Sequence, residues 1–448
     1  MLSLVDAAEQ IRARRLSPVE LTQQCLVQID RLEPTLNAFI TVTAELAMEQ
    51  ARRAEADIAA GNYRGPLHGI PIALKDLLDT AGVRTTAGSN QYRERVPQHD
   101  AELVRRLKDA GAVIIGKLNM HEFAFGMTGA VSAFGPTKNP RNPERIAGGS
   151  SSGSAAAVAA GMCLAAIGSD TAGSIRCPAA LCGIVGHRPS AKLLPMRGVV
   201  PLSTSFDTLG PMTRAVRDAG IMLDALSGTT HYESVLEEDI AQLRVGVARK
   251  NFFVDLDPEV GASMEAALAT LGSLVAQVRE IELPLPGFRT IFDAEIYEYH
   301  EAMIEQSPEL YDPRTLFRLD NCRGISATDY IRERRRLAQF RMKVEEVFER
   351  VDVIVTPTVP VPAPKLADVE TLAIPDVRPF EVKHLMRNTA PFSVLFWPSI
   401  SVPCGITRDG LPIGMQLSAR PGADSTVLRV AYAFEQVTGT GGVLPCCV

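Results

Sequence analysis

Two serine-bearing loops stand on either side of a run of small residues between Gly148 and Pro178. The first loop reads Gly-Gly-Ser-Ser-Ser-Gly-Ser, and the second ends in Gly173-Ser174. The run Ala155–Ala160 has high helix propensity but little side chain to bury, so a helix formed there must pack closely against its neighbours. Such a helix would hold hydroxyls of the two loops rigidly near each other. The arrangement is suited to nucleophilic chemistry on a substrate.

Two other interpretations of the first loop are excluded by its flanks. A P-loop ends in Gly-Lys-Ser or Gly-Lys-Thr, whereas this loop continues into Ser154-Ala155. Gly149–Gly153 fits Gly-x-Ser-x-Gly, but that nucleophile elbow follows a strand. Here the segment NPRNPERIA (139–147), with two prolines, precedes it. Composition alone leaves a structural role for the two loops as open as a catalytic one.

Residues 148–178 resemble the signature of the amidase signature family of serine hydrolases, whose pattern is similar to GGSSGGS followed by D-x-G-G-S-[IV]-R-x-P. The resemblance covers almost the whole chain. Further segments similar to the family are 67–89, 111–126, 132–140, 182–190, 206–214, 353–364 and 399–417. The resemblance implies an α/β fold, a single α/β/α sandwich with a central mixed β-sheet surrounded by helices.

We therefore expect one amidase domain over residues 1–448, although the length alone would allow two or three domains. Within it we expect a helical N-terminal layer at 1–60, a core with the catalytic residues at 67–215, and a variable, substrate-shaping region at 231–348. Strands that alternate with helices indicate the same α/β class. The apolar segments that predict strands are Ile70–Leu74, Ala112–Ile115, Ala165–Ile167, Ile184–Val185, Leu243–Ala248 and Val353–Thr356.

Amide hydrolysis needs an activated nucleophile, a proton donor for the leaving nitrogen and stabilisation of the oxyanion. The resemblance assigns the catalytic roles to Ser174 as nucleophile, Ser150 as bridging serine and Lys75 as base. Lys75 can accept a proton only if burial lowers its pKa from ~10.4 toward neutrality. Neutral Lys75 would then take a proton through Ser150 while Ser174 attacks the carbonyl, and water would hydrolyse the acyl-enzyme. The resemblance also implies a cis peptide bond between Gly149 and Ser150.

The resemblance places further groups around these three side chains. The backbone N–H groups of Thr171, Ala172, Gly173 and Ser174 would form the oxyanion hole. Supporting hydrogen bonds would come from Ser151, Asp170 and Arg176. Two positions depart from the family pattern, because Ser152 and Ala172 stand where the family often has glycine. Ala172 still offers its N–H, but its φ must lie in a region that alanine allows.

Two segments are candidates for the substrate pocket. The first, Phe125, Gly126, Met127 and Thr128, aligns with a loop that lines the acyl pocket in family members, and core packing explains it equally well. The second contains Asn388, Phe392 and Trp397, which we expect to shape an apolar acyl or aryl site.

Composition excludes several other classes of function. The formal net charge of −6 gives no electrostatic attraction for nucleic acid, so we expect no nucleic-acid partner. No uncharged apolar run is long enough to cross a bilayer, and no signal peptide precedes the first helix. The eight cysteines lack metal-ligand spacing and are interpreted as buried thiols of a cytoplasmic protein. We predict no metal and no cofactor, and many relatives form homodimers.

Two functional hypotheses follow from the resemblance. The first is a stand-alone amidase that hydrolyses a small-molecule carboxylic amide, and in addition an ester or carbamate. The second is the A subunit of an aspartyl/glutamyl-tRNA amidotransferase, which releases ammonia from glutamine within a complex. The segment 384–405 resembles stand-alone amidases, so the sequence favours the first hypothesis.

Overall fold

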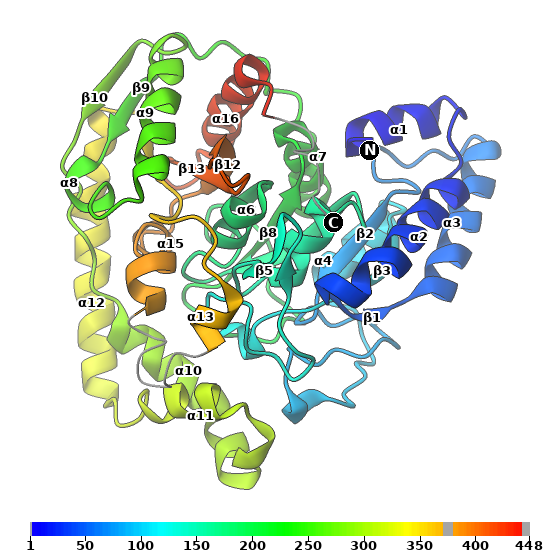
Figure 1. The fold of residues 1–448 in the computed structure, drawn as a ribbon, viewed down its shortest axis with the longest axis horizontal. Coiled ribbons are helices and arrows are strands. Elements are labelled where there is room, and N and C mark those ends of the chain that lie inside the picture. The colour runs from blue at the N-terminus through cyan, green and yellow to red at the C-terminus, as the bar shows by residue number, and fades with distance from the viewer. Residues whose placement is uncertain (1, 371–379, 441–448) are drawn as a thin grey trace.

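A large mixed β-sheet runs through the computed structural model, which describes residues 2–370 and 380–440 (Figure 1). Among these residues the sheet has 11 strands in the order β1-β3-β2-β6-β8-β7-β12-β13-β11-β9-β10. Its strands are β1 (Phe39–Val42), β2 (Pro71–Lys75), β3 (Val113–Leu118), β6 (Ala165–Asp170), β7 (Val185–Arg188), β8 (Thr208–Thr213), β9 (Arg244–Val247), β10 (Gln277–Glu280), β11 (Val353–Pro357), β12 (Ser399–Ile406) and β13 (Pro412–Ser418). A separate two-stranded sheet consists of β4 (Lys138–Asn139) and β5 (Asn142–Ile146).

Helices surround this sheet, which confirms the predicted fold class. The α-helices are α1 (Leu4–Arg12), α2 (Pro18–Leu36), α3 (Ala44–Ala59), α4 (Glu102–Asp109), α5 (Ser152–Ala159), α6 (Arg176–Cys182), α7 (Val216–Ser227), α8 (Arg249–Phe252), α9 (Pro258–Gly272), α10 (Arg289–Gln306), α11 (Pro313–Asp320), α12 (Ala327–Val344), α13 (Leu366–Glu370), α15 (Ala390–Val394) and α16 (Asp424–Thr438). Short 3-10 turns are η1 (Asn90–Tyr92), η2 (Glu122–Ala124), η3 (Pro308–Leu310) and η4 (Glu345–Glu349), and η5 (Val382–Met386) is a π-helical turn.

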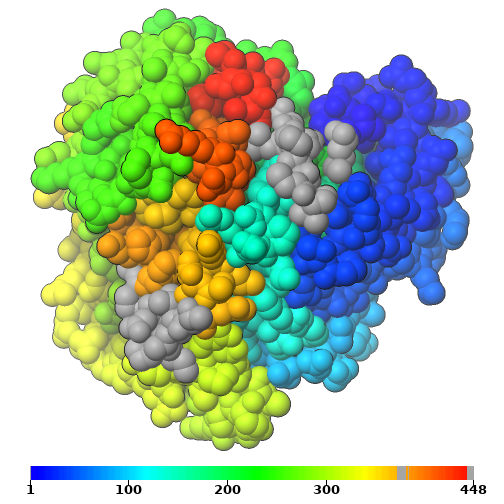
Figure 2. All heavy atoms as spheres, in the orientation of Figure 1, coloured from blue at the N-terminus to red at the C-terminus, as the bar shows by residue number. Residues whose placement is uncertain are grey.

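The N-terminal helices form one side of the molecule and the segment from α8 to α12 forms the opposite side (Figure 2). Helix α2 begins as expected: the Ser17 hydroxyl accepts hydrogen bonds from the Val19 and Glu20 N–H groups, and Pro18 occupies the first helical position. No helix in residues 2–370 and 380–440 is both long and apolar enough to cross a membrane.

The centre of the sheet places the candidate catalytic segments side by side. Strand β2 pairs in parallel with both β3 and β6, and all three strands are buried along their whole length. Because the strands are parallel, the chain leaves β2 and β6 at the same edge of the sheet. Lys75 is the last residue of β2, and the loop with Ser174 follows β6.

Helix α5 is the close-packed helix that the small residues predict, and it begins at Ser152 rather than at Ala155. All eight of its residues are buried. A Cβ atom at Gly153 would lie 2.2 Å from the Ala38 carbonyl oxygen and 2.6 Å from the Asn119 backbone nitrogen. Only glycine allows this approach, which brings the start of α5 against the chain that continues from β3.

Candidate active site

The Lys75 amine lies between two serine hydroxyls. Lys75 Nζ donates to Ser150 Oγ at 2.7 Å and to Ser169 Oγ at 2.8 Å. All three residues are buried. The peptide bond between Gly149 and Ser150 is cis, as the resemblance implies. The structure therefore brings together the predicted base and the predicted bridging serine, and adds Ser169, to which no role was assigned from the sequence.

Burial gives Lys75 the pKa that a base needs. Removal from water disfavours the ammonium form and lowers the pKa of Lys75 to about 7, although the carboxylates of Asp207 and Asp170 act in the opposite direction. A substantial fraction of Lys75 is thus neutral near pH 7. Neutral lysine can accept a proton from a neighbouring hydroxyl.

Ser174 lies on the neighbouring loop, but its hydroxyl faces another partner. Ser174 Oγ donates to the Met127 sulfur at 3.6 Å, and the structure records no hydrogen bond between Ser174 Oγ and Ser150 Oγ. The backbones are tied together, because the Ser151 N–H donates to the Ser174 carbonyl at 3.2 Å. Thioether sulfur is a weak acceptor, so the contact with Met127 opposes reorientation of Ser174 only slightly.

A buried ion pair holds the loop that carries Ser174. Arg176 donates through Nε and Nη2 to both oxygens of Asp170, at 3.0 and 2.9 Å. Burial alone would raise the pKa of Asp170, but the charges of Arg176 and Arg188 and hydrogen bonds to its oxygens lower it to about 2. Asp170 is therefore ionised near neutral pH, and its carboxylate accepts hydrogen bonds from Arg176 and from the loop that carries Ser174.

One of the four predicted oxyanion donors is already in use. The Gly173 N–H donates to Asp170 Oδ1 at 2.8 Å, because the ionised carboxylate is the nearest strong acceptor, and this corrects the prediction for Gly173. The N–H groups of Thr171, Ala172 and Ser174 have no recorded hydrogen-bond partner among the described residues. Ala172 is not among the described non-glycine residues with positive φ, whereas Gly173 has φ +130°. Of the four predicted oxyanion donors, Thr171, Ala172 and Ser174 thus remain candidates.

Ser151 and Ser152, which follow Ser150 in the first loop, hydrogen-bond to neighbouring segments rather than to Lys75. The Ser151 hydroxyl accepts from the Ser169 N–H and donates to the Ser169 carbonyl, both at 3.2 Å. Ser152 Oγ donates to Thr137 Oγ1 at 3.1 Å. Ser151 therefore supports the site through Ser169 rather than by direct contact with Lys75.

A pocket opens beside Ser174 and contains about 460 Å³ of empty space, part of it open to solvent. Three of the predicted substrate-binding residues, Phe125, Gly126 and Met127, line it. Thr128 does not: it is buried, and its hydroxyl faces His121 Nδ1 at 3.4 Å. The remaining lining residues are Ala124, Thr171, Ala172, Ser174, Leu202, Arg289, Phe292, Arg318, Glu381 and Met386.

The second predicted pocket segment is wrong, because its side chains do not line this pocket. Asn388 Nδ2 donates to the carbonyls of Phe252 and Pro357. Phe392 and Trp397 are fully buried in an apolar cluster with Phe252. Apolar side chains at these positions fill the core between the sheet and α12, so aromatic composition alone could not distinguish a pocket wall from core packing.

Charged residues that the sequence did not single out line the pocket. Arg318 of α11 donates through Nη2 to Glu381 Oε2 at 2.7 Å and through Nη1 to the Phe125 carbonyl at 2.7 Å. Glu381 Oε1 accepts from the Met127 N–H at 2.9 Å. Arg289, on α10, is half-exposed. Three lining residues, Arg289, Phe292 and Arg318, belong to the region 231–348, where the sequence predicted substrate-shaping residues.

Asp207 is a further residue that the sequence missed, although it lies within a segment similar to the family (206–214). Its Oδ1 accepts from the Thr171 hydroxyl at 2.6 Å, and its Oδ2 accepts from the N–H groups of Leu202 and Ser203. Burial raises the pKa of Asp207 to about 6, against the effect of these hydrogen bonds. The carboxylate joins the oxyanion loop to the segment that contributes Leu202 to the pocket.

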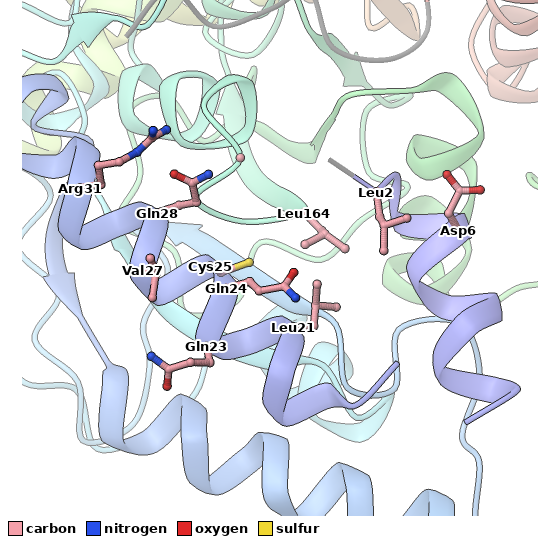
Figure 3. Close-up of a pocket in the computed structure, with 11 residues that line it drawn as sticks. Leu2, Asp6, Leu21, Gln23, Gln24, Cys25, Val27, Gln28, Arg31 and Leu164 are labelled. Atoms are coloured by element: carbon pink, nitrogen blue, oxygen red, sulfur yellow. The ribbon is translucent and has the colours of Figure 1, made fainter. Parts of the chain in front are cut away.

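A second hollow at the surface lacks this chemistry. Leu2, Leu21, Cys25 and Leu164 gather around it, with glutamines of α2 alongside (Figure 3). None of Lys75, Ser150 and Ser174 lines it. Within the described ranges, no three His, Cys, Asp or Glu side chains gather closely enough to hold a metal ion.

Comparison with known proteins agrees with this geometry. A family model described as Amidase matches residues 20–428. The chain belongs to the amidase family. As a family member it is an enzyme that acts on amide C–N bonds.

Curated amidase-family relatives match along nearly their whole length. The chain is 36% identical to the A subunit of the glutamyl-tRNA(Gln) amidotransferase of Moorella thermoacetica, over 98% of this chain and 96% of the relative. It is 39% identical to the protein of the same name from a Roseiflexus species, with the same coverage.

Solved structures of amidases resemble this chain over nearly its whole length. One described only as an amidase has a TM-score of 0.88 at 32% identity and covers 97% of this chain and 100% of its own. The native peptide amidase of Stenotrophomonas maltophilia has a TM-score of 0.85 at 29% identity, with 100% and 99% of the two chains covered.

Proposed function

We propose that this enzyme cleaves its amide through an acyl-enzyme on Ser174. The observation that carries the proposal is the contact of 2.7 Å between Lys75 Nζ and Ser150 Oγ, in a buried site that lowers the pKa of Lys75 to about 7. The site thereby has a base and a bridging hydroxyl beside a serine whose loop offers three N–H groups to an oxyanion. These are the groups that acyl transfer from an amide requires.

In the proposed reaction, Ser174 turns from Met127 toward Ser150 and attacks the amide carbon. Its proton passes to Ser150 while the Ser150 proton passes to Lys75, and the N–H groups of Thr171, Ala172 and Ser174 stabilise the oxyanion. The relay then reverses: the C–N bond breaks, the leaving nitrogen takes the proton, and ammonia or an amine departs. Water, activated by the same relay, attacks the ester and releases the acid. Catalytic hydrogen bonds are often long or absent before substrate binds. The lack of a hydrogen bond between Ser150 Oγ and Ser174 Oγ is therefore compatible with the proposed relay.

For the substrate we propose glutamine, with the chain acting as the A subunit of a tRNA amidotransferase. The sequence favoured the stand-alone amidase, but the curated relatives are subunits of this kind at 36% and 39% identity. The pocket lining supports the proposal through Arg289, whose half-exposed guanidinium contacts Asp293 and can also pair with the carboxylate of an amino-acid ligand. Arg318 and Glu381 also line the pocket, but their charges are paired with each other. Buried cysteines are compatible with the reducing cytoplasm in which we place the reaction.

A stand-alone amidase is the second candidate, and a specific observation favours it. The alignment with the Moorella relative spans 477 positions, whereas this chain has 448 residues. The relative therefore has segments that this chain lacks. A solved structure described as an amidase is also matched along its whole chain, at 32% identity.

Ammonia release by the purified chain distinguishes the two functions. Glutamine and a panel of aliphatic and aryl amides are tested with the chain alone, then with the remaining amidotransferase subunits, ATP and charged tRNA. Release from glutamine that depends on the added components supports the A-subunit function, and turnover of a simple amide by the chain alone supports the stand-alone amidase. Both activities should vanish in Ser174→Ala and Lys75→Ala. Turnover that survives in Ser174→Ala would contradict the acyl-enzyme.

A further inference from the structure

Lys75 has a second hydrogen-bond partner that the proposed reaction does not use. Lys75 Nζ donates to Ser169 Oγ at 2.8 Å, nearly as short as its contact of 2.7 Å with Ser150 Oγ. Ser169 is on β6, the strand that pairs in parallel with the Lys75 strand β2. The amine is therefore held between a hydroxyl from the first serine loop and a hydroxyl from the sheet.

The backbone of Ser169 is fixed on both sides. The Ser151 hydroxyl contacts both its N–H and its carbonyl at 3.2 Å, and β8 pairs Ser169 with Leu209. A Cβ atom at Gly168 would lie 2.9 Å from Ser151 Oγ, so this clamp leaves no room for a side chain next to it. The backbone position from which the Ser169 hydroxyl reaches Lys75 is thus set by the fold.

We propose that Ser169 is a positioning residue that orients the Lys75 amine toward Ser150. A neutral amine has two N–H bonds and one lone pair. When one N–H donates to Ser169, the lone pair can face the Ser150 hydroxyl, whose proton it must accept. Without the Ser169 hydroxyl the amine turns about the Cε–Nζ bond and spends less time in this orientation. The inference rests on the proposed role of Lys75 as base.

The charged surroundings of Lys75 determine how loss of Ser169 should appear in a pH profile. The carboxylates of Asp207 and Asp170 favour the ammonium form. His121 stays neutral, because burial and the charges of Arg318, Arg314 and Lys75 hold its pKa well below the usual value. The Ser169 hydroxyl accepts more strongly from an ammonium than from an amine. Its removal should therefore lower the pKa of Lys75 further.

The test compares Ser169→Ala with Ser169→Thr, which keeps the hydroxyl, and with Ser154→Ala as a matched control. Ser154 is another buried serine, and it donates to the Ile167 carbonyl of the same strand without contact to Lys75. We expect Ser169→Ala to lower kcat roughly 10- to 100-fold at unchanged KM, part of what general-base catalysis contributes. The acid limb of the pH profile of kcat should move to lower pH in Ser169→Ala. Ser169→Thr should keep most of the wild-type kcat. Ser154→Ala should match the wild type in kcat and in the position of the acid limb.

Thermal unfolding of each variant separates folding from catalysis. If Ser169→Ala unfolds early, Ser169→Cys replaces it, since a thiol has similar volume but accepts hydrogen bonds weakly. Wild-type kcat with an unmoved acid limb would overturn the inference, and so would an equal loss in Ser154→Ala. If Lys75→Ala retains wild-type turnover, the proposed catalytic mechanism fails instead.

Discussion

At the scale of single residues, the chemistry depends on where Lys75 lies in the sheet. As the last residue of β2 it is surrounded by buried strands, so its amine loses hydration that a surface lysine keeps. Ser150 and Ser169 supply two hydrogen bonds in place of water. Asp207 and Asp170 provide negative charge but do not contact the amine directly. The result is a lysine that is buried, hydrogen-bonded and close to neutral.

The pH dependence of turnover tests this description of Lys75. Because its pKa is lowered from 10.5 to about 7, the ammonium form predominates below pH 7 and the amine above it. We expect kcat to rise with pH through about 7 and to level off by about pH 8. A stopped or coupled assay for ammonia release between pH 5 and pH 9 would record the limb. A rate that still rises steeply between pH 8 and pH 9 would mean that Lys75 titrates as an ordinary lysine.

At the scale of elements, the loop between β6 and α6 is held in one shape by close packing. Gly173 has φ +130°, and a Cβ atom there would lie 2.1 Å from Thr389 Oγ1. Thr389 in turn donates to the Ala172 carbonyl at 2.7 Å. Residues from the C-terminal part of the chain therefore press on the predicted oxyanion loop. Glycine is required at position 173 for two reasons: its positive φ angle, and the close approach of the Thr389 side chain.

Gly173→Ala should remove activity, and Gly65→Ala is its matched control. Gly65 has φ +129° and no atom within 4 Å of the added Cβ, so it isolates the cost of the backbone angle. We expect about 1–3 kcal/mol of destabilisation from the angle in each variant, with an additional loss from the contact with Thr389 in Gly173→Ala alone. Urea unfolding and ammonia release would measure both effects. Equal stability and equal activity of the two variants would show that the contact with Thr389 is unimportant.

At the scale of the whole molecule, the pocket is assembled from segments far apart in the chain. Arg318 from α11 meets Glu381 and the loop with Phe125 and Met127. The side chains of Arg318 and Glu381 are only 5% and 4% exposed. A buried pair of this kind is costly to break, because the remaining charge has neither water nor a partner.

Arg318→Met should therefore destabilise the protein by about 3–5 kcal/mol and raise KM. Arg332→Met removes an exposed ion pair with Asp329, whose side chains are 53% and 54% exposed, and should change stability by less than about 1 kcal/mol. The double variant Arg318→Met/Glu381→Met should recover part of the loss, since no unpaired charge remains. Chemical denaturation and substrate kinetics provide the measurements. An Arg318→Met protein as stable as Arg332→Met would contradict the importance of the buried pair.

The sequence by itself determined the α/β class from strands that alternate with helices, and the two serine loops from their composition. The catalytic candidates Lys75, Ser150 and Ser174 came from contiguous motifs that resemble the amidase signature family. Apolar runs predicted the strands that carry Lys75 and precede Ser174, and small residues predicted α5. The predicted roles of these side chains still await the experiments above.

Only the tertiary structure decided which side chains surround them. It placed Ser169 and Asp207 beside the candidate catalytic groups, and Arg318 and Glu381 in the pocket, through contacts between strands and helices that no local spacing encodes. It also placed Phe392 and Trp397 in the core. The sequence could not predict this, because aromatic residues occur both in pocket walls and in packed interiors. Partners across parallel strands and across the pocket depend on register and helix packing, which a single sequence does not specify.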